Sequence, residues 1–184
     1  MITKLDSERG TSLIETAIAT GILLVVMAGL LSMAALATTY TENHGHLEAR
    51  TTEYAQDKME QLLALAYSDE ASDSVVFPAA ISGGTGLKIG GGTLIAGAVN
   101  TAAPVTGYVD WLAQDGSLLG GGTTPPATWF YERVWQVTCA VAPCSDVSPV
   151  TGVKQITITS TVRSSVGHAL IPKSTVTTLK ASQF

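Results

Sequence analysis

The chain has 184 residues, a formal net charge of −5 at pH 7, and only 14% charged residues. Nucleic-acid binding requires a basic face, so we expect no direct nucleic-acid partner. The length fits one small domain plus a membrane segment, and the many Thr, Ser, Gly and Ala residues suit an exported β-rich domain better than a cytosolic enzyme.

A long apolar run follows a short polar N-terminus. The run from Thr16 to Thr41 has no charged residue, whereas Met1–Gly10 is polar. About 20 apolar residues suffice to cross a bilayer as a helix, so this run is long enough. Glu15 directly precedes it and would lie at the lipid boundary. An ionisable side chain at that depth is costly, which makes Glu15 a functional candidate.

The residues around Glu15 resemble a known processing signal. Gly10-Thr11-Ser12-Leu13-Ile14-Glu15, followed by an apolar helix, resembles the prepilin signal of type IV pilins and type II secretion pseudopilins. The resemblance implies that a prepilin peptidase/N-methyltransferase cuts after Gly10 and methylates Thr11, where the family most often has Phe. It also implies that Glu15 pairs with the terminal amine of Thr11, in its own chain or in a neighbouring subunit, as filaments assemble.

Charges on either side of the apolar run predict its orientation. Lys4 and Arg9 precede the run, and acidic residues predominate after it, from Glu42 to Glu53. This asymmetry favours a cytoplasmic N-terminus. Together with the resemblance, it implies a single-pass inner-membrane protein with a periplasmic head. An inner-membrane assembly platform and other pilin or pseudopilin subunits would then take it into a pilus or pseudopilus filament.

We expect the helix to continue beyond the membrane to about Tyr67, because no proline interrupts the chain and an apolar stripe persists. The stripe consists of Tyr54, Met59, Leu62, Leu63, Leu65 and Ala66. The charged residues of this segment lie mostly elsewhere, at Arg50, Glu53, Asp57, Lys58 and Glu60. This pattern is typical of a half-exposed helix that packs on a globular head.

The end of the predicted helix resembles one subgroup of the same family. Ala55–Leu62 is similar to the acidic/basic-Met-Glu-x-Leu pattern of PilV-type minor pilins and I-type minor pseudopilins, although good helix-forming residues alone would also explain it. The pattern favours a minor subunit. The first alternative is a major pilin, and an alternative of another class is a membrane-anchored periplasmic binding protein that never enters a filament.

Glycine-rich stretches follow the helix. Ile81–Val105 contains Gly83–Gly84 and Gly90–Gly92, and a second stretch begins at Gly120–Gly122. A phosphate-binding loop would need a strand and a helix around a GxxxxGK[ST] motif, which these stretches lack. We therefore predict loops and turns.

Strand patterns occupy the remaining sequence. Tyr108–Leu112 and Ser117–Leu119 flank an Asp115–Gly116 turn signal, which predicts a hairpin. From Trp129 to Thr138, apolar and polar residues alternate, with Arg133 as an exception on the apolar face. Apolar residues also occur on the other face, so we expect both faces to be covered, one of them by the long helix.

The last two patterns complete the predicted sheet. Lys154–Arg163 and Ser174–Lys180 would form an antiparallel meander with the strand that begins at Trp129. A long helix packed on a small antiparallel sheet is an α+β fold. We divide the chain into a leader (1–10), a transmembrane and filament-core helix (11–40), a periplasmic half of the helix (41–67) and a β-rich head (68–184).

Two cysteines, Cys139 and Cys144, lie in the predicted head. An even cysteine count in an exported protein favours a disulfide. A zinc site would need further ligands, and no nearby His supplies one. We therefore favour a disulfide over free thiols or a metal site, in a loop between the first two strands of the meander at the edge of the head.

Other candidate sites are weaker. His44 and His46 would lie on different faces of the helix and have no evident third ligand. Three strand tryptophans could line a carbohydrate groove, although such residues more often form a core: Trp111, Trp129 and Trp135. We predict no enzyme activity, no metal and no cofactor.

Overall fold

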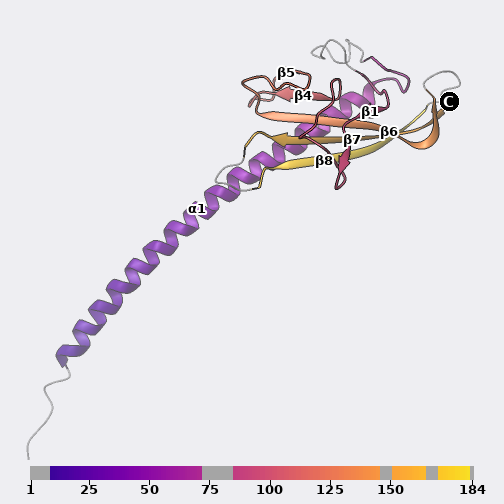
Figure 1. Ribbon diagram of the computed structural model, residues 1–184. Helices are drawn as coiled ribbons and strands as arrows, with labels where there is room; N and C mark the ends of the chain where they lie inside the picture. Colours follow the sequence, from indigo (N-terminus) through magenta and orange to yellow (C-terminus); the bar gives the residue numbers. More distant parts are fainter. Residues whose placement is uncertain (1–8, 72–84, 146–150, 165–169, 183–184) are drawn as a thin grey trace, which may run out of the picture. The chain divides into compact units, whose positions relative to one another are not determined.

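The structure is a computed structural model that describes residues 9–71, 85–145, 151–164 and 170–182. It has the predicted α+β architecture, with one long helix and an antiparallel sheet (Figure 1). The chain divides into two compact units, Met1–Asn43 and His44–Phe184. Most of the predicted leader (1–8) and the first glycine pair (Gly83–Gly84) lie outside the described residues.

Helix α1, Arg9–Ala64, belongs to both units and ends three residues before the predicted end at Tyr67. In the first unit, every side chain from Ser12 to Asn43 is exposed, and Val25 reaches 74%. The helix is long and apolar enough to span a membrane. An aliphatic surface of this extent requires cover by lipid or by other apolar helices.

A six-stranded sheet forms the scaffold of the second unit. Its strand order is β5-β4-β6-β7-β8, with β1 also paired to β6, and every neighbouring pair is antiparallel. The strands are β1 (Gly90–Gly91), β4 (Val109–Leu112), β5 (Leu118–Gly121), β6 (Tyr131–Ser145), β7 (Thr151–Val162) and β8 (Lys173–Ala181). A separate hairpin consists of β2 (Leu94–Ile95) and β3 (Ala98–Val99). The predicted hairpin and the predicted meander are both confirmed.

The C-terminal part of α1 packs against one face of the sheet (Figure 1). The main core contains Ala55, Met59, Leu62 and Leu65 from the helix side and Trp135, Val137, Ile156 and Ile158 from the sheet. A second cluster contains Tyr54, Leu112, Tyr131 and Val162. Leu63 and Ala66 were predicted to lie on the buried face, but both are exposed. Leu63 directly follows the buried Leu62, and adjacent helical positions point about 100° apart. Ala66 lies beyond the end of α1, so the helical stripe does not extend to it.

The opposite face of the sheet has its own apolar cluster of Val99, Val109, Trp111 and Val134, with Trp129 packed against it. We predicted that Trp129 would begin a strand and share a face with Tyr131. Instead β6 begins at Tyr131, and the Trp129 amide donates to the Pro126 carbonyl at 3.2 Å. This turn directs Trp129 to the opposite face, where its ring centroid lies 4.9 Å from that of Trp111.

Two glycines predicted to lie in a loop form strand β1. Gly90 and Gly91 pair with Val137 and Gln136 of β6. At Gly91, φ is +104°, and a Cβ would lie only 2.4 Å from the Trp135 carbonyl oxygen. Glycine permits both this conformation and this close approach. The strand was missed because it has no β-branched or aromatic side chain from which a strand pattern could be recognised.

Two lysines from the sheet bind carbonyl groups at the C-terminal end of α1 and just beyond it. Lys154 Nζ donates to the Tyr67 carbonyl at 2.9 Å. Lys180 Nζ donates to the carbonyls of Leu63 and Leu65. Cations at a helix C-terminus compensate both the free carbonyls and the negative end of the helix dipole. Because Lys154 and Lys180 are register partners on β7 and β8, the sheet holds the helix end from two adjacent strands.

Candidate functional site

Gly10, Thr11 and Glu15 lie together at the beginning of α1, which starts at Arg9. Glu15 follows Thr11 by four residues, so helical geometry puts the two positions on one face, one turn apart. The Glu15 side chain is exposed, and so are its apolar neighbours Ile14 and Ile18. Among the described residues, none donates a hydrogen bond to the Glu15 carboxylate or forms an ion pair with it. The predicted processing and assembly residues thus share one short segment.

The serine and threonine side chains of the apolar run bond to the helix itself. Each hydroxyl donates to a carbonyl one turn earlier, at 2.7 to 3.0 Å. The residues are Thr16, Thr20, Ser32, Thr38, Thr39 and Thr41. Hydroxyls bonded in this way are compatible with a lipid environment, because their polar groups do not need water. Glu15 is therefore the group at this end of the helix that still calls for a partner.

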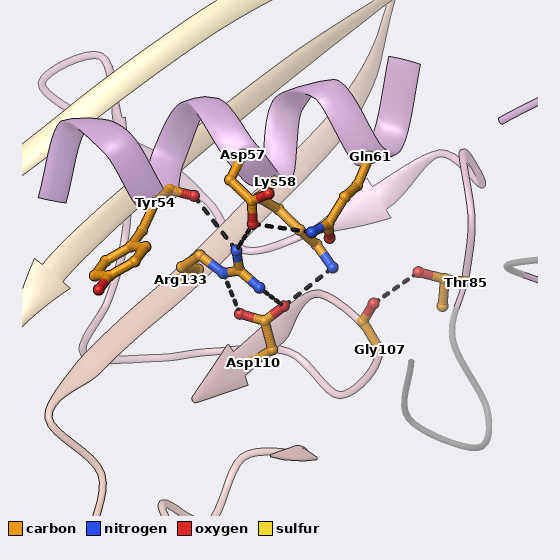
Figure 2. Close-up of polar contacts among 8 residues, drawn as sticks. All are labelled: Tyr54, Asp57, Lys58, Gln61, Thr85, Gly107, Asp110 and Arg133. Carbon is orange, nitrogen blue, oxygen red and sulfur yellow. Dashed lines mark hydrogen bonds and ion pairs between the residues drawn. The ribbon is translucent and has the colours of Figure 1, made fainter. Parts of the chain in front are cut away.

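A second arrangement of charged groups lies between α1 and the sheet (Figure 2), with three of its side chains buried and Asp57 exposed. Arg133 donates from Nε and Nη2 to the two Asp110 carboxylate oxygens at 2.7 and 2.9 Å. Lys58 Nζ lies 3.0 Å from the same carboxylate. Arg133 Nη1 donates to Asp57 at 2.8 Å. Two positive and two negative side chains therefore meet in one place, and Asp110 is only 1% exposed.

The pairing decides which of these groups stay charged. Burial alone would raise the pKa of Asp110, but Lys58 and Arg133 outweigh burial and hold that pKa below its usual value. Burial lowers the pKa of Lys58, and its Nζ also lies 4.1 Å from the Trp135 ring centroid. Asp110 is thus held as a carboxylate by two cations that are themselves largely removed from water.

This charge cluster (Asp57, Lys58, Asp110 and Arg133) fixes the helix on the sheet. The sequence pattern identified Arg133 as a charged exception on an apolar face, and the structure explains it by the Asp110 and Asp57 carboxylates. Lys58 was predicted to lie away from the buried face, but it is only 7% exposed. Its pairing with Asp110 offsets the cost of burial, and a partner this distant in sequence has no signal in the helix pattern.

A further buried carboxylate lies on the other face of β6. Glu132 is 6% exposed, between its register partners Trp111 and Thr161. No described residue donates a hydrogen bond to it, and burial raises its pKa to about 7. The sequence analysis missed Glu132, although the apolar residues Phe130 and Val134 on its face indicated that this face would be covered.

Cys139 and Cys144 form the predicted disulfide, with their Cα atoms 5.8 Å apart. We expected this disulfide to lie in a loop between two strands, but it does not. Both cysteines belong to the last part of β6, where the register with β7 shifts after Cys139 and again after Val141. The disulfide therefore closes the irregular end of a strand.

The histidines and tryptophans do not build the other candidate sites. His44 Nε2 contacts the Leu170 carbonyl oxygen at 3.2 Å, and Nδ1 lies 3.4 Å from Glu48. Within the described ranges, no group of three or more His, Cys, Asp or Glu side chains could hold a metal ion. Trp135 packs on the helix side of the sheet and Trp111 on the other, so the three tryptophans do not line one groove.

Comparisons with protein-family models, with curated proteins and with solved structures found no match to this chain. Its function is therefore inferred from its own residues and their geometry.

Proposed function

We propose that this chain is a structural subunit of a type IV pilus or type II secretion filament, anchored in the inner membrane by α1 before assembly. One observation carries the proposal. A glycine and a carboxylate, Gly10 and Glu15, stand five residues apart at the start of an apolar helix whose described side chains are all exposed up to Asn43. Such a helix needs lipid around it first and other apolar helices afterwards.

The proposal gives each N-terminal residue a role. A prepilin peptidase would cut after Gly10 and methylate the new terminus at Thr11. Glu15 would pair with a terminal amine, because a carboxylate surrounded by packed helices must be paired or protonated. Its exposure and the lack of a partner for it among the described residues support an intermolecular pairing.

The head supports a structural role rather than a catalytic one. Its charged side chains near α1 are used to join helix and sheet, as in the Arg133–Asp110 pair. Ala55–Leu62, the segment that favours a minor subunit, carries Lys58 and Met59, which are both buried against the head. We propose a minor pilin or minor pseudopilin with its head in the periplasm.

The decisive experiment compares Glu15→Gln with Glu42→Gln in cells that assemble the filament. Glu42 is a matched control because it is also an exposed helical carboxylate, directly after the apolar run. We expect both variants to insert in the membrane, and only Glu15→Gln to lose incorporation into sheared filaments. Normal incorporation of Glu15→Gln would refute the pairing role.

N-terminal mass spectrometry tests the processing step independently. The mature chain should begin at Thr11, with or without a methyl group, and Gly10→Ala should remain uncut. An uncut Gly10→Ala chain that is fully active would favour the alternative of a membrane-anchored periplasmic binding protein. A mature terminus at any other residue would contradict the assignment to this family.

A further inference from the structure

Two apolar side chains, Leu170 and Ile171, are exposed to solvent shortly before β8 begins at Lys173. Leu170 is 88% exposed, the highest value for a large apolar side chain in the described residues, and Ile171 is 52% exposed. The backbone around them is anchored. The Leu170 carbonyl contacts His44 Nε2, and the buried Pro172 accepts a hydrogen bond from the Val162 amide at 3.3 Å. A fixed backbone thus holds two apolar side chains outward.

The position of this apolar pair (Leu170 and Ile171) along α1 follows from the contacts between β8 and the helix. These contacts are Lys180 Nζ to the Leu63 carbonyl at 2.6 Å, Thr52 Oγ1 to Ser174 Oγ at 3.0 Å, and Leu170 O to His44 Nε2 at 3.2 Å. From the first contact to the last, the residue numbers decrease both in the helix (63, 52, 44) and in the β8 segment (180, 174, 170), so the two segments run in the same direction. With rises of about 1.5 and 3.3 Å per residue, each covers about 30 Å between the first and last contact. The apolar pair therefore lies level with His44.

His44 lies close to the level at which the helix would leave the bilayer. It follows Thr41, the last residue of the apolar run, by less than one helical turn. A helical run from Thr16 to Thr41 is about 40 Å long, and a bilayer with its headgroup layers is about 40–45 Å thick. A run of this length reaches from one boundary of the bilayer to the other, so His44 follows the end of the membrane-spanning segment by three residues.

We infer that Leu170 and Ile171 insert into the interfacial layer of the same bilayer that holds α1, as a second attachment of the head to the membrane. The inference rests on the membrane anchoring in the proposed function. Both side chains are apolar, and the exposed charges close to them along α1 and β8, at Glu42, Glu48 and Lys173, are of both signs. The attachment is therefore hydrophobic and does not need anionic lipid.

The test uses the full chain in phosphatidylcholine vesicles, with an environment-sensitive fluorophore on a single introduced cysteine. The native cysteines stay in their disulfide under non-reducing conditions. The test position is Leu170→Cys. Ile95→Cys is the control, because Ile95 is an exposed apolar residue on the β2–β3 hairpin, and Leu30→Cys reports on the membrane helix.

We expect the label at position 170 to emit at shorter wavelength in vesicles and to be quenched by nitroxides near the lipid headgroups, while the label at position 95 is not. Equal responses at 170 and 95, with the label at position 30 quenched, would overturn the inference and leave the anchoring intact. A label at position 30 that is not quenched would instead contradict the anchoring itself.

The vesicle experiment also distinguishes contact of the apolar pair with lipid from contact with a second copy of the chain. Quenching by lipid nitroxides that is unchanged at a lower protein-to-lipid ratio supports the bilayer as the occupant. In the contrary outcome, the label is protected from an aqueous quencher without being quenched by lipid nitroxides. If that protection is lost at a lower protein-to-lipid ratio, the inference is overturned in favour of a contact between copies. Anionic lipid added to the vesicles should leave the signal at position 170 unchanged.

Discussion

Asp110 is the residue at which the buried charges of the head converge. Its two oxygens accept from Arg133, and Lys58 lies at one of them. Nothing near Asp110 in the sequence marks these partners, because they come from a helix and a strand that are far away along the chain. Sequence periodicity identified the position of Arg133 as unusual, but only the structure identifies what it binds.

Asp110→Asn should strongly destabilise the head. The substitution leaves Lys58 and Arg133 buried without their common carboxylate, which costs about 3–5 kcal/mol for a broken buried pair. Urea unfolding of the full chain in detergent micelles measures the change by tryptophan fluorescence, since Trp111, Trp129 and Trp135 all lie in the second unit.

Glu53→Gln is the control for this experiment. Glu53 pairs with Arg50 at 2.8 Å, but both side chains are more than half exposed, so the loss should stay below about 1 kcal/mol. Similar losses for the two variants would show that burial does not determine the value of the Asp110 interactions.

Glu132 should make the stability of the head depend on pH. Its pKa is raised from 4.5 in the unfolded chain to about 7 in the folded head, so the folded state binds the proton more tightly. The free energy of unfolding should therefore fall as pH rises from about 4.5 to 7, and stay low above that range. Glu132→Gln should remove this dependence and stabilise the head at pH 8 by up to about 3 kcal/mol.

Urea unfolding at pH 5 and at pH 8, for both the unaltered chain and Glu132→Gln, checks this expectation. The two proteins should be closer in stability at pH 5 than at pH 8. A constant difference between them at both pH values would mean that Glu132 does not titrate in this range.

The elements differ in how far the sequence determined them. The helix, the hairpin of β4 and β5 and the meander of β6, β7 and β8 follow from periodicity and turn residues, and all are present. Strand β1 consists of two glycines, and its pairing depends on how closely a backbone without side chains can approach β6. A local pattern cannot indicate such tertiary proximity, which is also why the burial of Lys58 was missed.

Gly91→Ala tests whether close approach determines strand β1. The added Cβ would meet the Trp135 carbonyl oxygen in a left-handed backbone conformation, so we expect a loss of more than about 2 kcal/mol. Gly97→Ala is the control, because φ there is +81° but nothing lies within 4 Å of the added atom. Its cost should be about 1 kcal/mol, and an equal cost at Gly91 would exclude a steric role. Urea unfolding again gives both values.

At the scale of the whole molecule, the two units differ in what completes them. The second unit satisfies its buried helix face within the chain, through the sheet. The first unit exposes its apolar side chains along its whole described length, so its partners are lipid or other helices. The sequence could predict the fold and the need for such partners. It could not identify them, because under the proposed function the group that pairs with Glu15 belongs to an assembly rather than to this chain alone.

The contacts between α1 and the sheet also determine how the head would bear force. Along its last part, the helix is joined to the sheet by Thr52 to Ser174, by the charge cluster, and by the two lysines at its end. Because β8 extends in the direction of the helix axis, a pull along α1 would load these bonds in shear, as a group. Bonds loaded together in shear resist a pull far better than bonds that open one after another, so the head is built to remain attached when its helix is under tension.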